Sequence, residues 1–136
     1  MKAHLQSVED LTIFDIDGEV FFCRAIPELE KYFASTLGDI ISTRMGKPKL
    51  LTPTNDRGYL KVGVRLGNRS VNRKVHRLVA AAFLKEADVD PDGAERIQIN
   101  HIDSNKHNNR VANLEHTSRR ENVRHAMAMA EISARL

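Results

Sequence analysis

The chain has 136 residues, of which 41% are hydrophobic and 29% are charged, and its formal net charge is +3. That length suits one domain or two small ones with a modest core. No apolar run approaches the ~18 residues that cross a bilayer, and the N-terminal residues lack the apolar segment of a signal peptide. We therefore expect no membrane helix and no membrane partner.

The chain contains one cysteine, Cys23. It has no partner for an intramolecular disulfide or for a CxxC zinc clamp. We therefore expect a reduced, cytoplasmic compartment, and a polar site that does not depend on zinc bound to thiolates.

The charge is distributed unevenly along the chain. Residues 1–40 carry 3 Lys/Arg and 8 Asp/Glu, residues 41–77 carry 10 and 1, and residues 78–136 carry 8 and 9. A net charge of +9 within one short block is commonly matched by a polyanion. The distribution favours a nucleic-acid partner over the alternative, a solvated basic face on an ordinary protein.

The N-terminal part predicts short antiparallel strands. Residues 11–23 form two β-type runs around the turn Asp17-Gly18, and residues 32–42 form two more around Gly38.

The clearest strand signal lies in residues 58–75, on both sides of a Gly67-Asn68 turn. The apolar side chains that alternate on one face are Leu60, Val62, Val64 and Leu66. This pattern predicts a two-stranded ribbon with a core face and a basic, polar face. Such a ribbon can enter a DNA major groove or lie along phosphates.

A short helix is predicted for residues 75–84, VHRLVAAAFL, because alanine favours helix and the apolar residues have helical spacing. His76, near its start, is more often a capping or structural residue than a metal ligand. Residues 86–95 are an acidic loop.

The last third predicts a strand, a polar loop, a second strand and a helix. The strands are residues 96–99 and 113–118, and a capping box of Ser118 and Glu121 starts the helix. The helix residues expected to face the core are Val123, Met127, Ala130 and Ile132. The polar loop is too rich in Asn and His to build a core, so it is either solvated or the wall of a polar site.

Two motifs imitate known sites without their context. IFDIDGEV, residues 13–20, imitates the DxDG motif of haloacid-dehalogenase-type phosphatases, but no parallel βαβ pattern follows it. DVDPDG, residues 88–93, imitates an EF-hand, but Ile99 stands where a bidentate Glu is needed. A hairpin and an acidic loop explain these segments, and the phosphatase remains a distant hypothesis.

Three segments resemble the ββα-metal core of HNH endonucleases, in the phage and intron-encoded homing branch. They are VHRLVAAAFL (75–84), INHIDSNKHNNRVANLEH (99–116) and SRRENVRHA (118–126). YFASTLGDIIS (32–42) and LLTPTNDRGYLKVGV (50–64) resemble the nuclease-associated DNA-binding module that often precedes such cores. The resemblance implies an α+β fold, with an antiparallel β-rich DNA-binding module in residues 1–74 and an HNH ββα-metal nuclease core in residues 75–136.

The resemblance assigns roles to four residues of a nuclease that hydrolyses phosphodiester bonds with one metal ion. His101 is the general base that takes a proton from the attacking water. Asn113 hydrogen-bonds backbone across the loop, which directs His101 at the phosphorus. Asn122 and Asn100 are the expected protein ligands of one Mg²⁺ or Mn²⁺, which prefers oxygen.

The resemblance also implies double-stranded DNA as the partner, a 5′-phosphate and a 3′-hydroxyl as products, and a bacterial cytoplasm if the protein is phage-encoded. A monomer is favoured, and the oligomeric state stays open. The basic residues expected to contact DNA are Lys61, Arg65, Arg69, Arg73, Lys74, Arg119 and Arg120.

One departure keeps an alternative open. Some relatives have Asp where this chain has Asn100, and two neutral amides make a weaker cation site, which Asp103 could assist electrostatically. The alternative is a non-catalytic DNA-binding protein with a degenerate HNH core. Asn109 and its neighbouring asparagines are expected to form turns, and His125 either touches a phosphate or lies on the surface.

Overall fold

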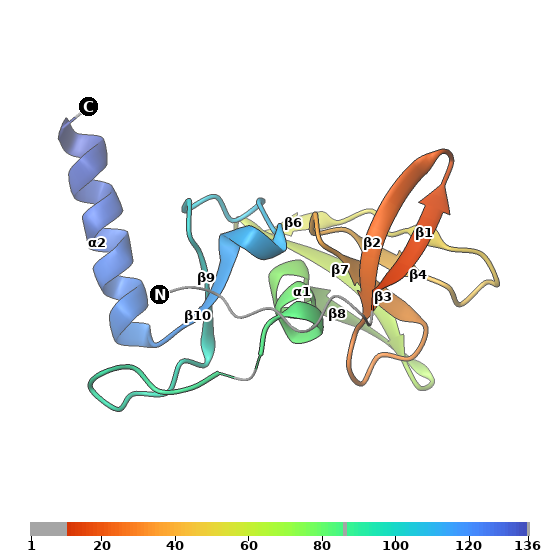
Figure 1. Cartoon of the computed structure of the whole chain (residues 1–136), viewed down its shortest axis with the longest axis horizontal. Coiled ribbons are helices and arrows are strands. Elements are labelled where there is room, and N and C mark those ends of the chain that lie inside the picture. Colours follow the sequence, from red (N-terminus) through yellow and green to blue (C-terminus); the bar gives the residue numbers. More distant parts are fainter. Residues whose placement is uncertain (1–10, 86, 136) are drawn as a thin grey trace.

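The computed structural model describes residues 11–85 and 87–135. It contains three antiparallel sheets and two α-helices, so the predicted α+β class is confirmed. The short helix α1 (Val75–Phe83) lies in the middle of the molecule, and the longer helix α2 (Arg119–Arg135) stands at one end (Figure 1). In this part of the chain no helix is long and apolar enough to cross a membrane.

The first sheet is a meander of five strands in chain order. The strands are β1 (Thr12–Ile16), β2 (Glu19–Ala25), β3 (Tyr32–Ser35), β4 (Ile40–Ser42) and β5 (Lys49–Leu50). Asp17 and Gly18 join β1 to β2 with positive φ angles of 53° and 87°, as a two-residue hairpin turn requires. The hairpins predicted around Asp17-Gly18 and Gly38 are confirmed.

The second sheet is the predicted ribbon, β7 (Tyr59–Leu66) and β8 (Arg69–Lys74), with β6 (Thr54–Asp56) added at its edge. Val62 and Val64 are 3% and 1% exposed, so the apolar face of β7 packs into the core as its alternation predicts.

The register of β7 and β8 sorts the basic side chains between the two faces of the ribbon. Lys61 lies opposite Lys74, whereas Val62 lies opposite Arg73 and Leu66 opposite Arg69. Because directly opposed residues of an antiparallel pair point to the same side, Arg69 and Arg73 share the face of Val62. We call the other face, which carries Tyr59, Lys61, Arg65 and Lys74, the polar face of the ribbon.

One hydrophobic core surrounds α1 and takes residues from both sides of the expected boundary between residues 74 and 75. Val62 and Val64 come from the N-terminal side, and Val79 and Leu114 come from the C-terminal side. The division into two domains stays a prediction.

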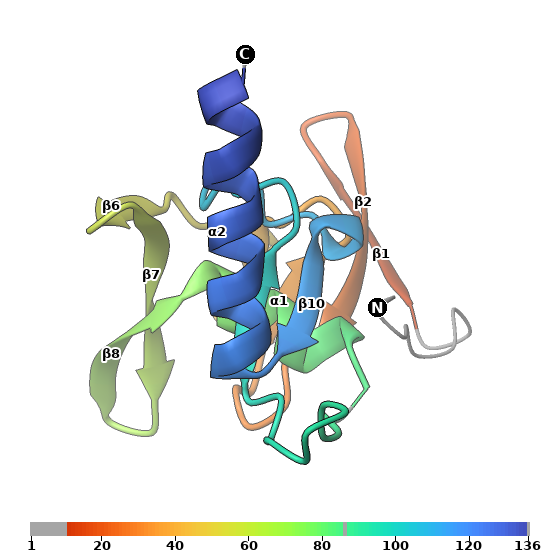
Figure 2. The same cartoon turned by 90° about the vertical axis from the view of Figure 1, so that its left-hand side faces the viewer.

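The third sheet consists of β9 (Gln98–His101) and β10 (Leu114–Thr117), which follows a single 3-10 turn, η2 (Val111–Asn113). The strand expected at residues 96–99 is thus displaced by two residues. Figure 2 shows α2 lying across this hairpin, with β7 and β8 to one side. Ser118 and Glu121 form the predicted capping box, with reciprocal bonds of 3.1 and 3.2 Å.

The prediction that the apolar side of α2 faces the core is wrong. Val123, Met127 and Ile132 are 50%, 67% and 54% exposed, and no residue of α2 is buried. Helical spacing identifies an apolar stripe, but the residues of α2 that line a pocket with β9 run only from Arg119 to Ala126, and the rest of the helix leans away from the β9–β10 hairpin (Figure 1).

Candidate active site

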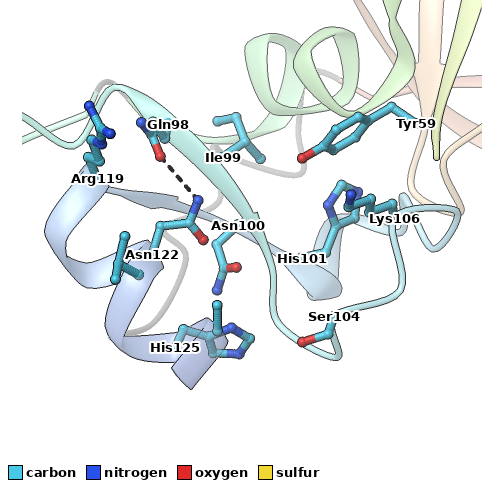
Figure 3. A pocket seen from close by; sticks show the side chains of 12 residues that line it. Tyr59, Gln98, Ile99, Asn100, His101, Ser104, Lys106, Arg119, Asn122 and His125 are labelled. Carbon is cyan, nitrogen blue, oxygen red and sulfur yellow. Dashed lines mark hydrogen bonds between the residues drawn. The ribbon is translucent and has the colours of Figure 1, made fainter. Parts of the chain in front are cut away.

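A pocket of about 440 Å³ opens between the end of β9, the loop that follows it, the first turns of α2 and the start of β7 (Figure 3). Of the residues predicted for the site, Asn100, His101, Asn122 and Arg119 line it together. The residues that complete the lining are Tyr59, Gln98, Ile99, Ser104, Lys106, Val123, His125 and Ala126. Asn113 lies outside the lining, beneath the loop.

His101 is the last residue of β9 and is 6% exposed. Its Nε2–H donates a 2.7 Å hydrogen bond to Oδ1 of Asn109, which is itself 4% exposed. An imidazole that carries its proton on Nε2 keeps the lone pair on Nδ1. Because the strand ends at His101, this side chain and that of Asn100 reach the same pocket despite strand alternation.

Asn109 is supported by the turn between β3 and β4. Gly38 has φ of +95°, and a Cβ there would lie 2.7 Å from the backbone C and O of Asn109. Val111 N also donates to Thr36 O at 3.0 Å. The N-terminal sheet therefore fixes the residue that holds the ring of His101.

Two further rings pack beside His101. The ring centroids of Tyr59 and His76 are 5.1 Å apart, and those of His76 and His101 are also 5.1 Å apart. Burial lowers the pKa of His76 to about 4, with smaller contributions from His101 and two basic neighbours. A neutral His76 thus forms the floor under His101, in line with the structural role expected for it.

Asn113 closes the polar loop. Its Nδ2 donates to Asn108 O at 2.8 Å and to Asp103 Oδ1 at 2.9 Å, and its Oδ1 accepts from Asp103 N at 3.0 Å. Hydrogen bonds, above all the one from Asn108, hold the pKa of Asp103 below its usual value. Asp103 is therefore engaged within the loop and does not line the pocket.

Asn100 and Asn122 each donate through Nδ2 to a side chain of the β9–β10 hairpin. Asn100 donates to Glu115 Oε1 and Asn122 donates to Gln98 Oε1, both at 3.1 Å. Within the described residues no donor bonds to either Oδ1. Two amide oxygens are thus available to the pocket.

This donor set fits a hard divalent cation, because Mg²⁺ takes oxygen ligands and retains several waters. The described residues contain no group of three or more His, Cys, Asp or Glu that could hold a metal. Because the described lining has no carboxylate, the candidate protein ligands are the Oδ1 atoms of Asn100 and Asn122.

The pocket carries positive charge. Its lining includes Lys106 and Arg119 and, among the described residues, no carboxylate. Lys106 Nζ lies 4.7 Å from the centroid of the Tyr59 ring, in the range of a cation–π contact. Its side chain passes over Gly58, where a Cβ would lie 3.3 Å from Cδ. A positive pocket of this kind favours an anionic ligand.

The predicted DNA contacts divide into groups. Arg119 lies in the pocket, and Arg120 pairs with Asp92 at 3.0 Å. Lys74 on the polar face pairs with Asp56 at 2.9 Å. Lys61 and Arg65 share that face, which reaches the pocket at Tyr59, whereas Arg69 and Arg73 are on the other face.

His125 anchors the first turns of α2. Its Nε2–H donates a 2.9 Å bond to Ile102 O, directly after His101. His125 also lines the pocket.

Sequence reasoning missed four residues of the site. Asn109 was expected to be a turn former, and Glu115, Tyr59 and Lys106 were given no role there. Glu115 could have been found by pairing the two strands, since it lies directly opposite Asn100. Nothing local in the sequence distinguishes Asn109 from the other asparagines of the loop.

Sequence comparison finds HNH endonucleases, although no family model matches the chain. The chain is 37% identical over 105 residues to the SPbeta prophage-derived putative HNH homing endonuclease YosQ of Bacillus subtilis (strain 168), covering 75% of this chain and 56% of that protein. It is 32% identical over 120 residues to an uncharacterized HNH endonuclease, L247, of Acanthamoeba polyphaga mimivirus, covering 86% and 29%.

Structural comparison gives the same family. A solved structure of the HNH homing endonuclease I-HmuI, from work on its DNA binding and cleavage, matches with a TM-score of 0.58 and 25% identity, over 88% of this chain and 59% of that one. This chain is 29% identical over 102 residues to I-HmuI of Bacillus phage SP01. It spans between 29% and 59% of the lengths of these relatives. By sequence and by fold, the chain belongs to the HNH endonuclease family.

Proposed function

We propose that this chain is a metal-dependent DNA endonuclease of the HNH homing type, which hydrolyses phosphodiester bonds in the pocket at the end of β9. The observation that carries the proposal is the lining of that pocket: the imidazole of His101 and two amide oxygens, on Asn100 and Asn122, without a protein donor among the described residues. The relatives support it, since YosQ is named a putative HNH homing endonuclease and I-HmuI is an HNH homing endonuclease that binds and cleaves DNA.

His101 is the general base in this proposal. Nδ1 takes the proton of a water molecule as that water attacks the phosphorus, a contribution of about 10² to 10⁴ in rate for general bases. The bond from Nε2–H to Asn109 fixes the ring and its tautomer, and Asn113 keeps the loop closed around it.

Asn100 and Asn122 hold one Mg²⁺ or Mn²⁺ through their Oδ1 atoms. When bound, the cation supplies Lewis-acid stabilisation of the negative charge on the phosphate and on the leaving 3′ oxygen. The expected products are a 5′-phosphate and a 3′-hydroxyl.

The positive side chains orient the DNA. Lys106 and Arg119 bind backbone phosphates at the pocket, where neither has an anionic partner in the described residues. Lys61 and Arg65 extend the contact along the polar face of the ribbon, away from Tyr59. Phosphate contacts of this kind position the duplex without reading its sequence.

A second candidate is a DNA-binding protein whose HNH core no longer cuts. The observation that favours it is the absence of a carboxylate from the described lining of the pocket. By the family resemblance, Asn100 stands at a position where an aspartate is also expected. Two amides bind a cation more weakly than an amide and a carboxylate do.

Incubation of supercoiled plasmid with Mg²⁺, with Mn²⁺ or with a chelator separates the two candidates. The parent protein should nick or linearise the plasmid with either metal and leave it intact with the chelator. Asn122→Ala should lose cleavage and keep duplex binding, because it removes an oxygen ligand and no positive charge. Retained DNA binding without any metal-dependent nicking by the parent would establish the non-catalytic candidate.

A further inference from the structure

Glu115, on β10, lies directly opposite Asn100 in the register of the β9–β10 hairpin. Directly opposed residues project from the same face, and the two side chains meet there: Asn100 Nδ2 donates to Glu115 Oε1 at 3.1 Å. Asn100 is 6% exposed, and Glu115 is half-buried behind it, outside the lining of the pocket. Within residues 11–85 and 87–135, no cationic side chain lies within ion-pair distance of Glu115.

The chemistry of this contact determines which way the Asn100 amide points. An ionised carboxylate has only acceptors, so the group that Asn100 presents to Glu115 must be its NH₂. The carbonyl Oδ1 is then held on the other side, away from Glu115. Orientation of an amide is ordinarily ambiguous, and here the partner removes the ambiguity.

Asn122 provides an internal contrast. Its Nδ2 bonds to Gln98 Oε1, also at 3.1 Å. Both partners are neutral amides, and a 180° rotation of both would keep the hydrogen bond. This contact therefore does not fix the orientation of the Asn122 amide and adds no charge. The two candidate metal ligands therefore differ: only Asn100 has a carboxylate behind it.

We propose that Glu115 is a positioning residue for the metal ion, and that it supplies from behind Asn100 the negative charge that the pocket lining lacks. It holds Asn100 Oδ1 toward the cation and polarises the amide by accepting its N–H. This inference rests on the proposed metal-dependent function. It explains how an asparagine can stand where some relatives have an aspartate without loss of the site's charge.

The test measures Mn²⁺ binding directly, from the electron paramagnetic resonance signal of the free ion, in the presence of a short duplex. A His101→Ala background keeps the duplex intact. Glu115→Gln retains side-chain size and hydrogen bonding but removes the charge and the acceptor-only constraint. It should weaken Mn²⁺ binding by about 10- to 100-fold, as loss of a partner behind a metal ligand commonly does.

Two further variants distinguish this role from a structural one. Glu131→Gln removes the same charge from the exposed end of α2 and should leave Mn²⁺ binding unchanged. Asn100→Asp combined with Glu115→Gln exchanges the carboxylate and the amide within the same hydrogen bond. This exchange should restore binding at least to the level of the background protein, with the thermal unfolding of all these proteins closely similar.

Equal Mn²⁺ binding by the background protein and its Glu115→Gln variant would overturn the inference and leave the proposed function intact. Failure of the exchanged pair to restore binding would also overturn it. Absence of Mn²⁺ binding by the background protein, together with absence of nicking by the parent, would overturn the inference and the proposed function together.

Discussion

Two loops, one on each side of β9, are each organised around an aspartate of their own, and the two loops have different roles. Asp90 accepts from the backbone N–H groups of Asp92 and Ala94 and from the hydroxyl of Ser118, at 2.9, 2.9 and 2.6 Å. It is 4% exposed and ties the acidic loop to the start of α2.

Asp103, in the loop after β9, accepts from Asn105, Asn108 and Asn113 at 2.8 to 2.9 Å. Hydrogen bonds lower the pKa of both Asp103 and Asp90, so both carboxyls are structural groups. The loop of Asp103 nevertheless carries Asn109, which holds His101, whereas the described residues of the loop of Asp90 contribute nothing to the lining of the pocket around His101. The aspartate that organises a loop therefore does not decide whether the loop serves the pocket; other residues that the loop carries, such as Asn109, decide it.

The largest expected effect separates two histidines of the same stretch. His101→Ala should lower the plasmid cleavage rate by about 10² to 10⁴ while leaving duplex affinity nearly unchanged, because it removes the proposed general base and no permanent charge. His107→Ala is the matched control, since His107 is exposed and its imidazole bonds only Asn55, at 3.0 Å, among the described residues. Single-turnover cleavage measures both, and a His101→Ala rate above about a tenth of the parent's would exclude His101 as the base.

The next effect distinguishes His76 from the exposed histidines by pH. The pKa of His76 falls to about 4 on folding, from an ordinary value of 6.5. The unfolded chain therefore binds more protons than the folded protein between these values, so stability falls as pH decreases through that range. Across the whole range, the protonation of His76 should lower the free energy of unfolding by an amount on the order of 3 kcal/mol.

Thermal unfolding between pH 7 and pH 4 measures this dependence, and His76→Phe should remove much of it while keeping the packing of an aromatic ring. Folding lowers the pKa of Asp90 and of Asp103 from 3.8. The stability that these two carboxylates contribute is therefore lost below the pH range in which His76 titrates. Parallel pH profiles for the parent and His76→Phe would show that His76 is not the titrating group.

A smaller effect separates two asparagines of the polar loop. Asn109→Leu should lower the cleavage rate by about 10- to 100-fold, because a misplaced catalytic group costs rate without loss of the group itself. Asn105→Ala changes an exposed loop asparagine and should stay within a few-fold of the parent. Since duplex affinity should be unaffected in both variants, the measurement is the single-turnover rate at saturating protein, and equal losses would contradict a positioning role for Asn109.

Features that depend on neighbouring residues could be predicted from the sequence. The alternation in β7, the Asp17-Gly18 turn and the capping box of Ser118 each lie within a few residues, and the structure has them where the sequence places them. The strands β5 and β6 contain two and three residues, too few for a periodic signal. The apolar stripe of α2 was misjudged because spacing defines a face but not whether anything covers it.

The candidate site was predictable only in part, for a related reason. Asn100, His101 and Asn122 were identified through a family resemblance, and the structure brings them to one pocket. The partner residues depend on strand register and on loop closure, which single-sequence patterns do not determine. Glu115 and Asn109 reach the site in this way, through contacts with Asn100 and His101.

The smallest expected effect, a few-fold in affinity for each charge, separates the basic residues of the ribbon by face. Lys61→Gln with Arg65→Gln should reduce the slope of log K against log salt by about 2, since each lost phosphate contact releases about 0.9 fewer counterions. Arg69→Gln with Arg73→Gln removes the same charge from the face of Val62 and should change the slope much less. Both pairs lower the net charge equally, so a difference between them reports position rather than long-range attraction. Equal slopes for the two pairs would mean that the duplex contacts both faces, or the edge, of the ribbon, and that register does not select its DNA contacts.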